Sequence, residues 1–188
     1  MIVVAIASDP TATGDPSGRL AETIAGRAAA AGSTVQYVAR IPADEHGDRL
    51  VLRLGRRGVG NAAVLRDAPG SAAPGLEAAD LELALRYLAG FRVLVIVGPT
   101  SPDLLRIAGE ASRFSGASVV LATVGSSPEQ DSVPAGATVI EAGRADGESG
   151  SASVVAAYAV ALDAGAGPPA AWRDATGRLA VEAAQEER

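Results

Sequence analysis

The polar residues with potential for chemistry gather at three places in the sequence. Asp9 follows the apolar run 2–7, Thr100 and Ser101 follow the apolar run 93–97, and the polar stretch 143–151 holds carboxylates among glycines and serines. Carboxylates act as general bases, hydroxyl groups bind polar ligands, and backbone N–H groups at the start of a helix hold anions. We therefore treat each of these three places as a candidate for binding or catalysis.

The composition removes several classes of chemistry. The chain has no cysteine, and all 16 of its basic residues are arginine. A thiolate metal site, a cysteine nucleophile, a Schiff-base lysine and the lysine of a phosphate-binding loop are thus excluded. The net charge of -6 and the few aromatic residues argue against nucleic acid as a partner, because phosphate neutralisation needs clustered positive charge. Any phosphate must be held by arginine or by backbone N–H groups.

The hydropathy pattern argues against a membrane protein. No apolar run approaches the roughly 18 to 20 residues that a membrane span requires. The chain also passes from Met1 straight into a short apolar run, without the basic flank of a signal peptide. We expect a cytoplasmic protein with no membrane partner.

Apolar runs of strand length alternate with longer stretches of helical period, which is typical of βαβ units around a parallel sheet. The 188 residues suit one domain, spanning residues 1–188. We predict strands at 2–7, 34–38, 62–65, 93–97, 118–122 and 137–141, and helices at 17–31 (capped by Ser17), 44–57, 76–88, 102–115, 152–164 and 169–186. The predicted fold class is α/β, a three-layer Rossmann-like arrangement with a mostly parallel sheet flanked by helices.

Three stretches resemble the PfkB/ribokinase family of carbohydrate kinases. Residues 38–59 are similar to the family's strand, its acidic D-x-x-G turn (here Asp44-Glu45-His46-Gly47) and its helix ending in Gly-Val. Residues 18–32 resemble the helix after the glycine-rich sugar-binding signature, and residues 146–153 lie where the family keeps D-T-x-G-A-G-D-x-F. The resemblance implies a ribokinase-like fold and, if kinase-type binding is retained, ATP and Mg²⁺ as cofactors.

The last of these motifs departs from the family at the catalytic position. In the family the final Asp of the motif takes the proton of the sugar hydroxyl, and here that position is Ala152. Loss of a general base commonly costs about 10² to 10⁴ in rate. Ser149, Gly150 and Ser151 lie where the resemblance places an anion hole, so we expect their N–H groups to bind an anion.

The sugar-binding part is altered as well. The family's glycine pair and asparagine correspond to Gly18-Arg19 and Thr23, which leaves Gly18 as a ligand-binding candidate, and Asp9 lies where the family places a substrate-binding aspartate. Only a short turn follows the strand at 2–7, so we expect the family's lid strands to be absent. The stretch 121–139 is also too short for the nucleotide-side strands. The chain thus resembles a truncated, degenerate sugar kinase.

Several candidate residues also have a structural interpretation. Asp146 and Glu148 either replace the missing base or belong to a solvated loop. Thr100 and Ser101 either bind a polar ligand or serve the helix that begins at Pro102, where Ser101 is an ordinary N-cap.

The charged turn and helix at 44–57 have structural interpretations too. His46 is expected to be exposed or to cap a helix, and its acidic neighbours Asp44, Glu45 and Asp48 favour the helix dipole or hold a cation. No metal site is predicted. The arginines at 53, 56 and 57 are expected to form a solvated helix end.

Three functional hypotheses follow. The first is a non-catalytic kinase-like protein that binds a small ligand (a sugar, a nucleoside or phosphate) or a partner protein. The second is an active carbohydrate or nucleoside kinase, or another phosphotransferase, that uses Asp146 or Glu148. The third is a structural module that forms a homodimer or pairs with a different chain.

Overall fold

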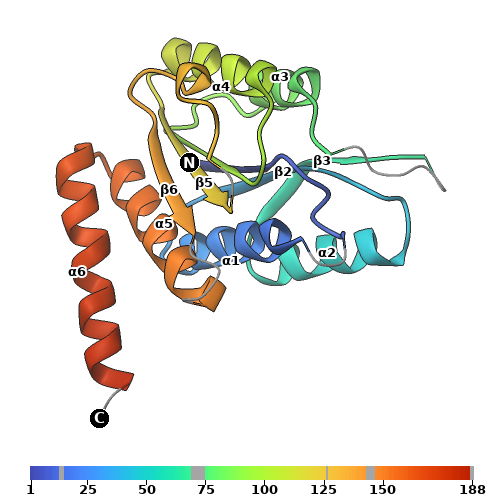
Figure 1. Cartoon of the computed structure of the whole chain (residues 1–188). Helices are drawn as coiled ribbons and strands as arrows, with labels where there is room; N and C mark the ends of the chain where they lie inside the picture. The colour runs from blue at the N-terminus through green and yellow to red at the C-terminus, as the bar shows by residue number, and fades with distance from the viewer. Residues whose placement is uncertain (13–14, 69–74, 126, 143–146, 187–188) are drawn as a thin grey trace.

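The computed structural model describes residues 1–12, 15–68, 75–125, 127–142 and 147–186. Its centre is a six-stranded sheet in the order β3-β2-β1-β4-β5-β6, with every neighbouring pair parallel (Figure 1). The strands are β1 (Ile2–Ile6), β2 (Val35–Ile41), β3 (Gly60–Arg66), β4 (Val93–Val97), β5 (Ser118–Val124) and β6 (Thr138–Ala142). The helices are α1 (Pro16–Ala30), α2 (Glu45–Arg56), α3 (Ala78–Tyr87), α4 (Pro102–Ser115), a short 3-10 turn η1 (Gln130–Ser132), α5 (Gly147–Asp163) and α6 (Pro168–Glu186).

The helices cover both faces of the sheet. Figure 1 shows α1, α2 and α5 on one face and α3 and α4 on the other. Along β1, Ile2, Val4 and Ile6 belong to the core under the first group of helices, whereas Val3 and Ala5 belong to the core under the second. Burial on both faces explains why the central strands are continuous apolar runs. The predicted α/β fold with helices on both faces of the sheet is confirmed.

Most element boundaries lie within two residues of the predicted ones, with three differences. Strand β2 runs on to Ile41, because its last residues pair with β3. Asp15, not Ser17, caps α1: its carboxylate accepts the Ser17 N–H at 2.8 Å, and Pro16 occupies the first helical turn. Helix α5 begins at Gly147 instead of Ala152.

The arginines at the end of α2 do more than form a solvated helix end. Arg53 binds both carboxylate oxygens of Glu22 on α1, with its Nε 3.0 Å from Oε1 and its Nη2 3.0 Å from Oε2. Arg57 Nη1 lies 3.1 Å from Glu22 Oε1. Because Glu22 is only 9% exposed, these arginines compensate a buried carboxylate and tie α2 to α1.

The acidic residues at the start of α2 stabilise the helix terminus. Asp44 is the N-cap, and Glu45 and Asp48 lie in the first turn, where negative charge favours the helix dipole. The Asp44 carboxylate accepts the N–H groups of His46 and Gly47 at 2.9 and 3.0 Å, and Asp48 pairs with Arg66 at 2.7 Å. The His46 side chain is exposed. Among the described residues, no three His, Asp or Glu side chains lie close enough together to hold a metal ion.

Helix α6 packs against α5 and then extends away from the sheet (Figure 1). Its Trp172 ring meets Tyr158 of α5 edge to face, with ring centroids 5.8 Å apart. Within the described part of the chain, no helix is long and apolar enough to cross a membrane.

Candidate functional site

The candidate site lies where the chain changes from one face of the sheet to the other. The adjacent central strands β1 and β4 lead into helices on opposite faces, α1 and α4. Open α/β sheets bind ligands outside the carboxyl ends of the strands at such a switch point. The residues at these ends are Ser8 and Asp9 after β1, and Gly98 to Ser101 after β4. The sequence had predicted that Asp9, Thr100 and Ser101 follow these two strands.

Asp9 organises the turn that leaves β1. Its Oδ1 accepts the backbone N–H of Thr11 at 2.8 Å and the Thr11 hydroxyl at 2.7 Å. This local turn fixes the carboxylate while an ionised carboxylate can still accept hydrogen bonds through Oδ2. A ligand-binding role for Asp9 stays a prediction. The two hydrogen bonds from Thr11 fix the orientation of the side chain.

Asp15 adds a second carboxylate, at the N-terminus of α1. Burial raises its pKa, but interactions with Ser8 and Ser17, among them the Ser17 N–H that its carboxylate accepts, outweigh burial and hold the pKa below its usual value of 3.8. Asp15 is therefore ionised at neutral pH. Because a negative charge already occupies this helix terminus, the position favours a ligand that donates hydrogen bonds over a phosphate.

Gly98 lets the end of β4 approach this turn closely. It has a φ of +94°, and a Cβ there would lie 3.1 Å from Ser17 Oγ and 3.4 Å from Ser8 Oγ. Ser17 is buried. The end of β4, the turn after β1 and the start of α1 thus form one packed polar cluster.

A segment before α3 crosses the end of β1. Leu76 donates its N–H to the carbonyl of Ala7 at 3.0 Å, and a Cβ on Gly75 would lie 2.5 Å from the same oxygen. Leu76 is buried in the core under α3 and α4. The α3 side of this strand end is therefore closed.

Arg40 of β2 holds this segment in place. Its Nε lies 3.2 Å from Asp67 Oδ1 and 3.5 Å from Asp80 Oδ2, and its Nη1 lies 3.5 Å from Glu77 Oε1. These carboxylates flank the segment on both sides, at the end of β3 and at the start of α3. The guanidinium group thus ties the two ends of the connection to β2.

The other predicted ligand residues have clear structural roles. Ser101 caps α4, since its hydroxyl accepts the Leu104 N–H at 3.3 Å, while Thr100 beside it is partly exposed. Gly18 is buried in the first turn of α1, and a Cβ there would lie 2.4 Å from the carbonyl oxygen of Pro10. The glycine is thus required by close packing of the turn. Ligand binding by these three residues stays a prediction.

The C-terminal motif forms the start of α5. Asp146 lies outside the described residues, as do the side chains of Glu148 and Ser149. Because the helix begins at Gly147, the backbone N–H of Ser149 falls among those of the first turn that lack partners within the helix. The N–H groups of Gly150 and Ser151 lie further along, where they are in register with helix carbonyl groups. Anion binding by Ser149, Gly150 and Ser151 stays a prediction.

Ala152 is fully buried. Its side chain has 0% exposure and belongs to the core that α5 forms with α1, which includes Ala21 and Ala25. In this structure the position assigned to the family's base contributes a methyl group to helix packing.

Sequence reasoning missed three polar residues of this edge: Ser8, Asp15 and Thr123. Thr123 lies near the end of β5, beside β4, with 3% exposure and with no hydrogen-bond partner for its Oγ1 among the described residues. Position in the sequence could have revealed two of these residues, because Ser8 follows an apolar run and Thr123 lies near the end of one. Asp15 carries no such signal, since a polar stretch of sequence separates it from the run at 2–7.

Comparisons with known proteins identify the fold. No protein-family model and no curated protein matches the sequence. Among solved structures, a PfkB protein from Polaromonas sp. JS666 is similar, with a TM-score of 0.58 and 15% identity over 93% of this chain and 92% of its own. An E. coli protein assigned as ribokinase II, in complex with ATP and Mg²⁺, has a TM-score of 0.60 and 11% identity over 92% and 89% of the two chains.

A third structure, Sa239, has a TM-score of 0.64 and 8% identity over 96% of this chain and 92% of its own. At these identities the likeness establishes the fold alone. The chain has the ribokinase-like α/β fold of PfkB-type sugar kinases, as the sequence resemblance predicted.

Proposed function

We propose that this chain is a non-catalytic ligand-binding protein built on the ribokinase-like fold. The observation that carries the proposal is the full burial of Ala152 between α5 and α1. A methyl group in the core cannot accept the proton of an attacking hydroxyl, so phosphoryl transfer lacks the base that the family resemblance assigns to this position.

The polar edge of the sheet supports binding of a small neutral polyol, such as a sugar or a nucleoside. Asp9 and the ionised Asp15 offer carboxylate oxygens that accept hydrogen bonds from hydroxyl groups. Thr100, at the end of the neighbouring strand, offers a hydroxyl that both donates and accepts. The two carboxylates disfavour a phosphate at the same place.

A turnover assay tests the absence of catalysis. We expect the purified chain, incubated with Mg-ATP and a panel of sugars and nucleosides, to form no ADP above the protein-free rate. The matched variants are Glu148→Ala and Asp146→Ala, with Asp174→Asn on exposed α6 as a control. Turnover that is lost in either alanine variant but kept in the control would identify a substitute base and contradict the proposal.

A further inference from the structure

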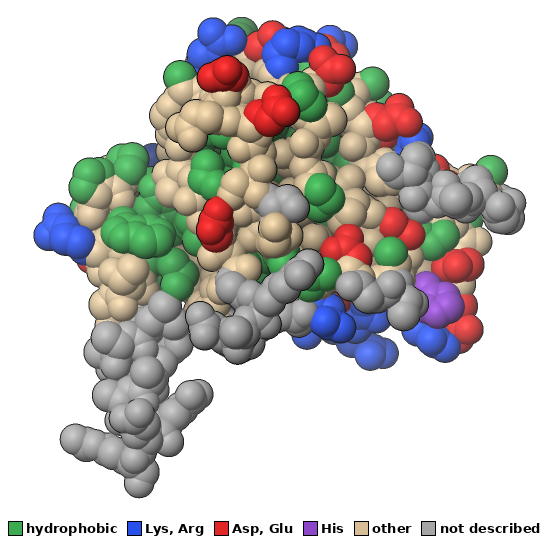
Figure 2. Space-filling view, in the orientation of Figure 1, with side chains coloured by type: hydrophobic (Ala, Val, Ile, Leu, Met, Phe, Trp, Pro, Cys, Tyr) green, Lys and Arg blue, Asp and Glu red, His purple; other side chains and the backbone are tan. Residues whose placement is uncertain are grey.

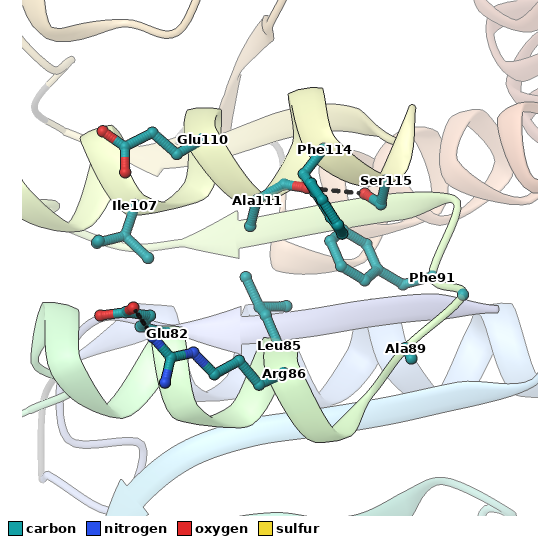
Figure 3. Close-up of a pocket in the computed structure, with 11 residues that line it drawn as sticks. Glu82, Leu85, Arg86, Ala89, Phe91, Ile107, Glu110, Ala111, Phe114 and Ser115 are labelled. Carbon is teal, nitrogen blue, oxygen red and sulfur yellow. Dashed lines mark hydrogen bonds and ion pairs between the residues drawn. The ribbon is translucent and has the colours of Figure 1, made fainter.

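An apolar groove lies between α3 and α4, at the amino-terminal edge of the sheet and away from the candidate ligand site. Its volume is about 670 Å³. Leu85 of α3, Ile107 and Ala111 of α4, and Phe91 just before β4 form its apolar lining, and Phe114 lies at its rim near the end of α4 (Figure 3). Leu85, Phe91 and Ile107 are themselves buried, so they form a fixed floor.

One large apolar side chain projects at the rim of this groove. Phe114 lines the groove and is 96% exposed. A single exposed apolar residue is ordinary, but one that stands beside an apolar recess with a buried floor marks an interaction surface.

The charges at this surface are balanced. Glu82 pairs with Arg86 along α3, and Arg106 pairs with Glu110 along α4, each at a spacing of four residues. Figure 2 shows basic and acidic side chains side by side over these helices. The chain as a whole carries a charge of -6, so two copies repel each other in general. This face lets two acidic chains approach, and it lacks the single-sign field that would recruit a charged partner.

We propose that the groove face is the contact between two copies of this chain, with Phe114 of each copy seated in the groove of the other. A two-fold contact uses the same patch on both subunits, so the patch must be complementary to itself. Here the projecting aromatic side chain and the apolar recess lie on one surface, which meets that requirement. The contact leaves the carboxyl ends of the strands open and does not depend on the proposed ligand.

Sedimentation equilibrium of the wild type and a Phe114→Ser variant tests the contact. We expect a dimer for the wild type and a dissociation constant at least about tenfold higher for the variant, because buried aromatic residues carry much of the binding energy of interfaces. The matched control is Leu52→Ser on α2, where the replaced side chain is 59% exposed on the other face, and it should dimerise like the wild type. Since Phe114 is almost fully exposed within one chain, its replacement should leave the unfolding temperature of the monomer unchanged.

Site-specific cross-linking gives an independent measurement, because the chain has no cysteine to interfere. An Ala89→Cys variant places a thiol at the groove, and a short bis-maleimide should join it to its partner, whereas Leu52→Cys should stay uncross-linked. A monomeric wild type at high micromolar concentration would overturn the proposal. So would a dimer that persists unchanged in Phe114→Ser, since the contact would then lie elsewhere.

Discussion

Replacing Ala152 by aspartate distinguishes two interpretations of this position. In one, residue 152 is part of the hydrophobic core; in the other, it lies in an accessible catalytic site that lacks only its base. In the structure the Ala152 side chain is fully buried between α5 and α1. Burial of an unpaired carboxyl group raises its pKa by about 3 to 5 units, and each unit corresponds to about 1.4 kcal/mol. An unfolded aspartate has a pKa of about 3.9, so only about 3 units of this shift act below neutral pH. We therefore expect Ala152→Asp to lower the free energy of unfolding by about 4 kcal/mol at neutral pH, a large part of the about 5 to 15 kcal/mol of a typical domain.

Urea denaturation followed by circular dichroism measures this loss. The matched control is Ser151→Asp, which introduces the same group at a partly exposed position on the same helix and should cost less than about 1 kcal/mol. The introduced carboxyl group has a higher pKa in the folded chain than in the unfolded chain, so its penalty is smallest below pH 4 and grows as pH rises through the folded value.

Two results would refute this reasoning. Ala152→Asp could prove as stable as Ser151→Asp at neutral pH, which would mean that position 152 is not in the core. Alternatively, the variant could gain ATP turnover, which would mean that residue 152 faces a catalytic site that is complete except for its general base.

Three further perturbations probe the structure around the site. Glu22→Ala should reduce the free energy of unfolding by about 1 to 3 kcal/mol in urea denaturation, because it leaves the half-exposed Arg53 without its carboxylate partner. Gly75→Ala should lower the free energy of unfolding more than Gly58→Ala in the same assay. Both glycines have a positive φ, but only at Gly75 would a Cβ lie 2.5 Å from a backbone oxygen. Equal losses of stability in the two variants would contradict the packing described. The lowered pKa of Asp15 predicts stability that is present above pH 4 and lost as pH falls through the folded value, so Asp15→Asn should flatten the acid limb of the unfolding temperature against pH.

Local sequence patterns predicted the fold well because the central strands are compatible with few other structures. The runs at β1 and β4 are apolar at every position, which fits only strands covered on both faces. Helix α4 was predicted in full, since Ser101, Pro102 and the left-handed Gly116 mark its two ends. The early start of α5 was missed because Gly147 to Ser151 consists mostly of residues with low helix propensity, and their helical state is set by the surrounding structure.

The candidate site was predicted only in part. Position after a central strand was sufficient to select Asp9, Thr100 and Ser101, because parallel strands bring such residues to one edge. The contribution of Asp15 depends on its surroundings in the folded turn, where Ser8 and Ser17 lie close to it, and spacing does not reveal those neighbours. The pairing of Glu22 with Arg53 was missed for a similar reason, as it joins residues that lie 31 positions apart on two helices.

A thermal-shift titration with sugars, nucleosides, phosphate and Mg-ATP tests the central claim most directly. A bound ligand at about a hundred times its dissociation constant adds about 2.7 kcal/mol, which corresponds to several degrees in a domain of this size. The account predicts such a shift with a neutral sugar or nucleoside, lost in Asp9→Asn and kept in Asp174→Asn. A flat response across the panel, or a shift that Asp9→Asn leaves intact, would contradict ligand binding at the carboxyl ends of β1 and β4.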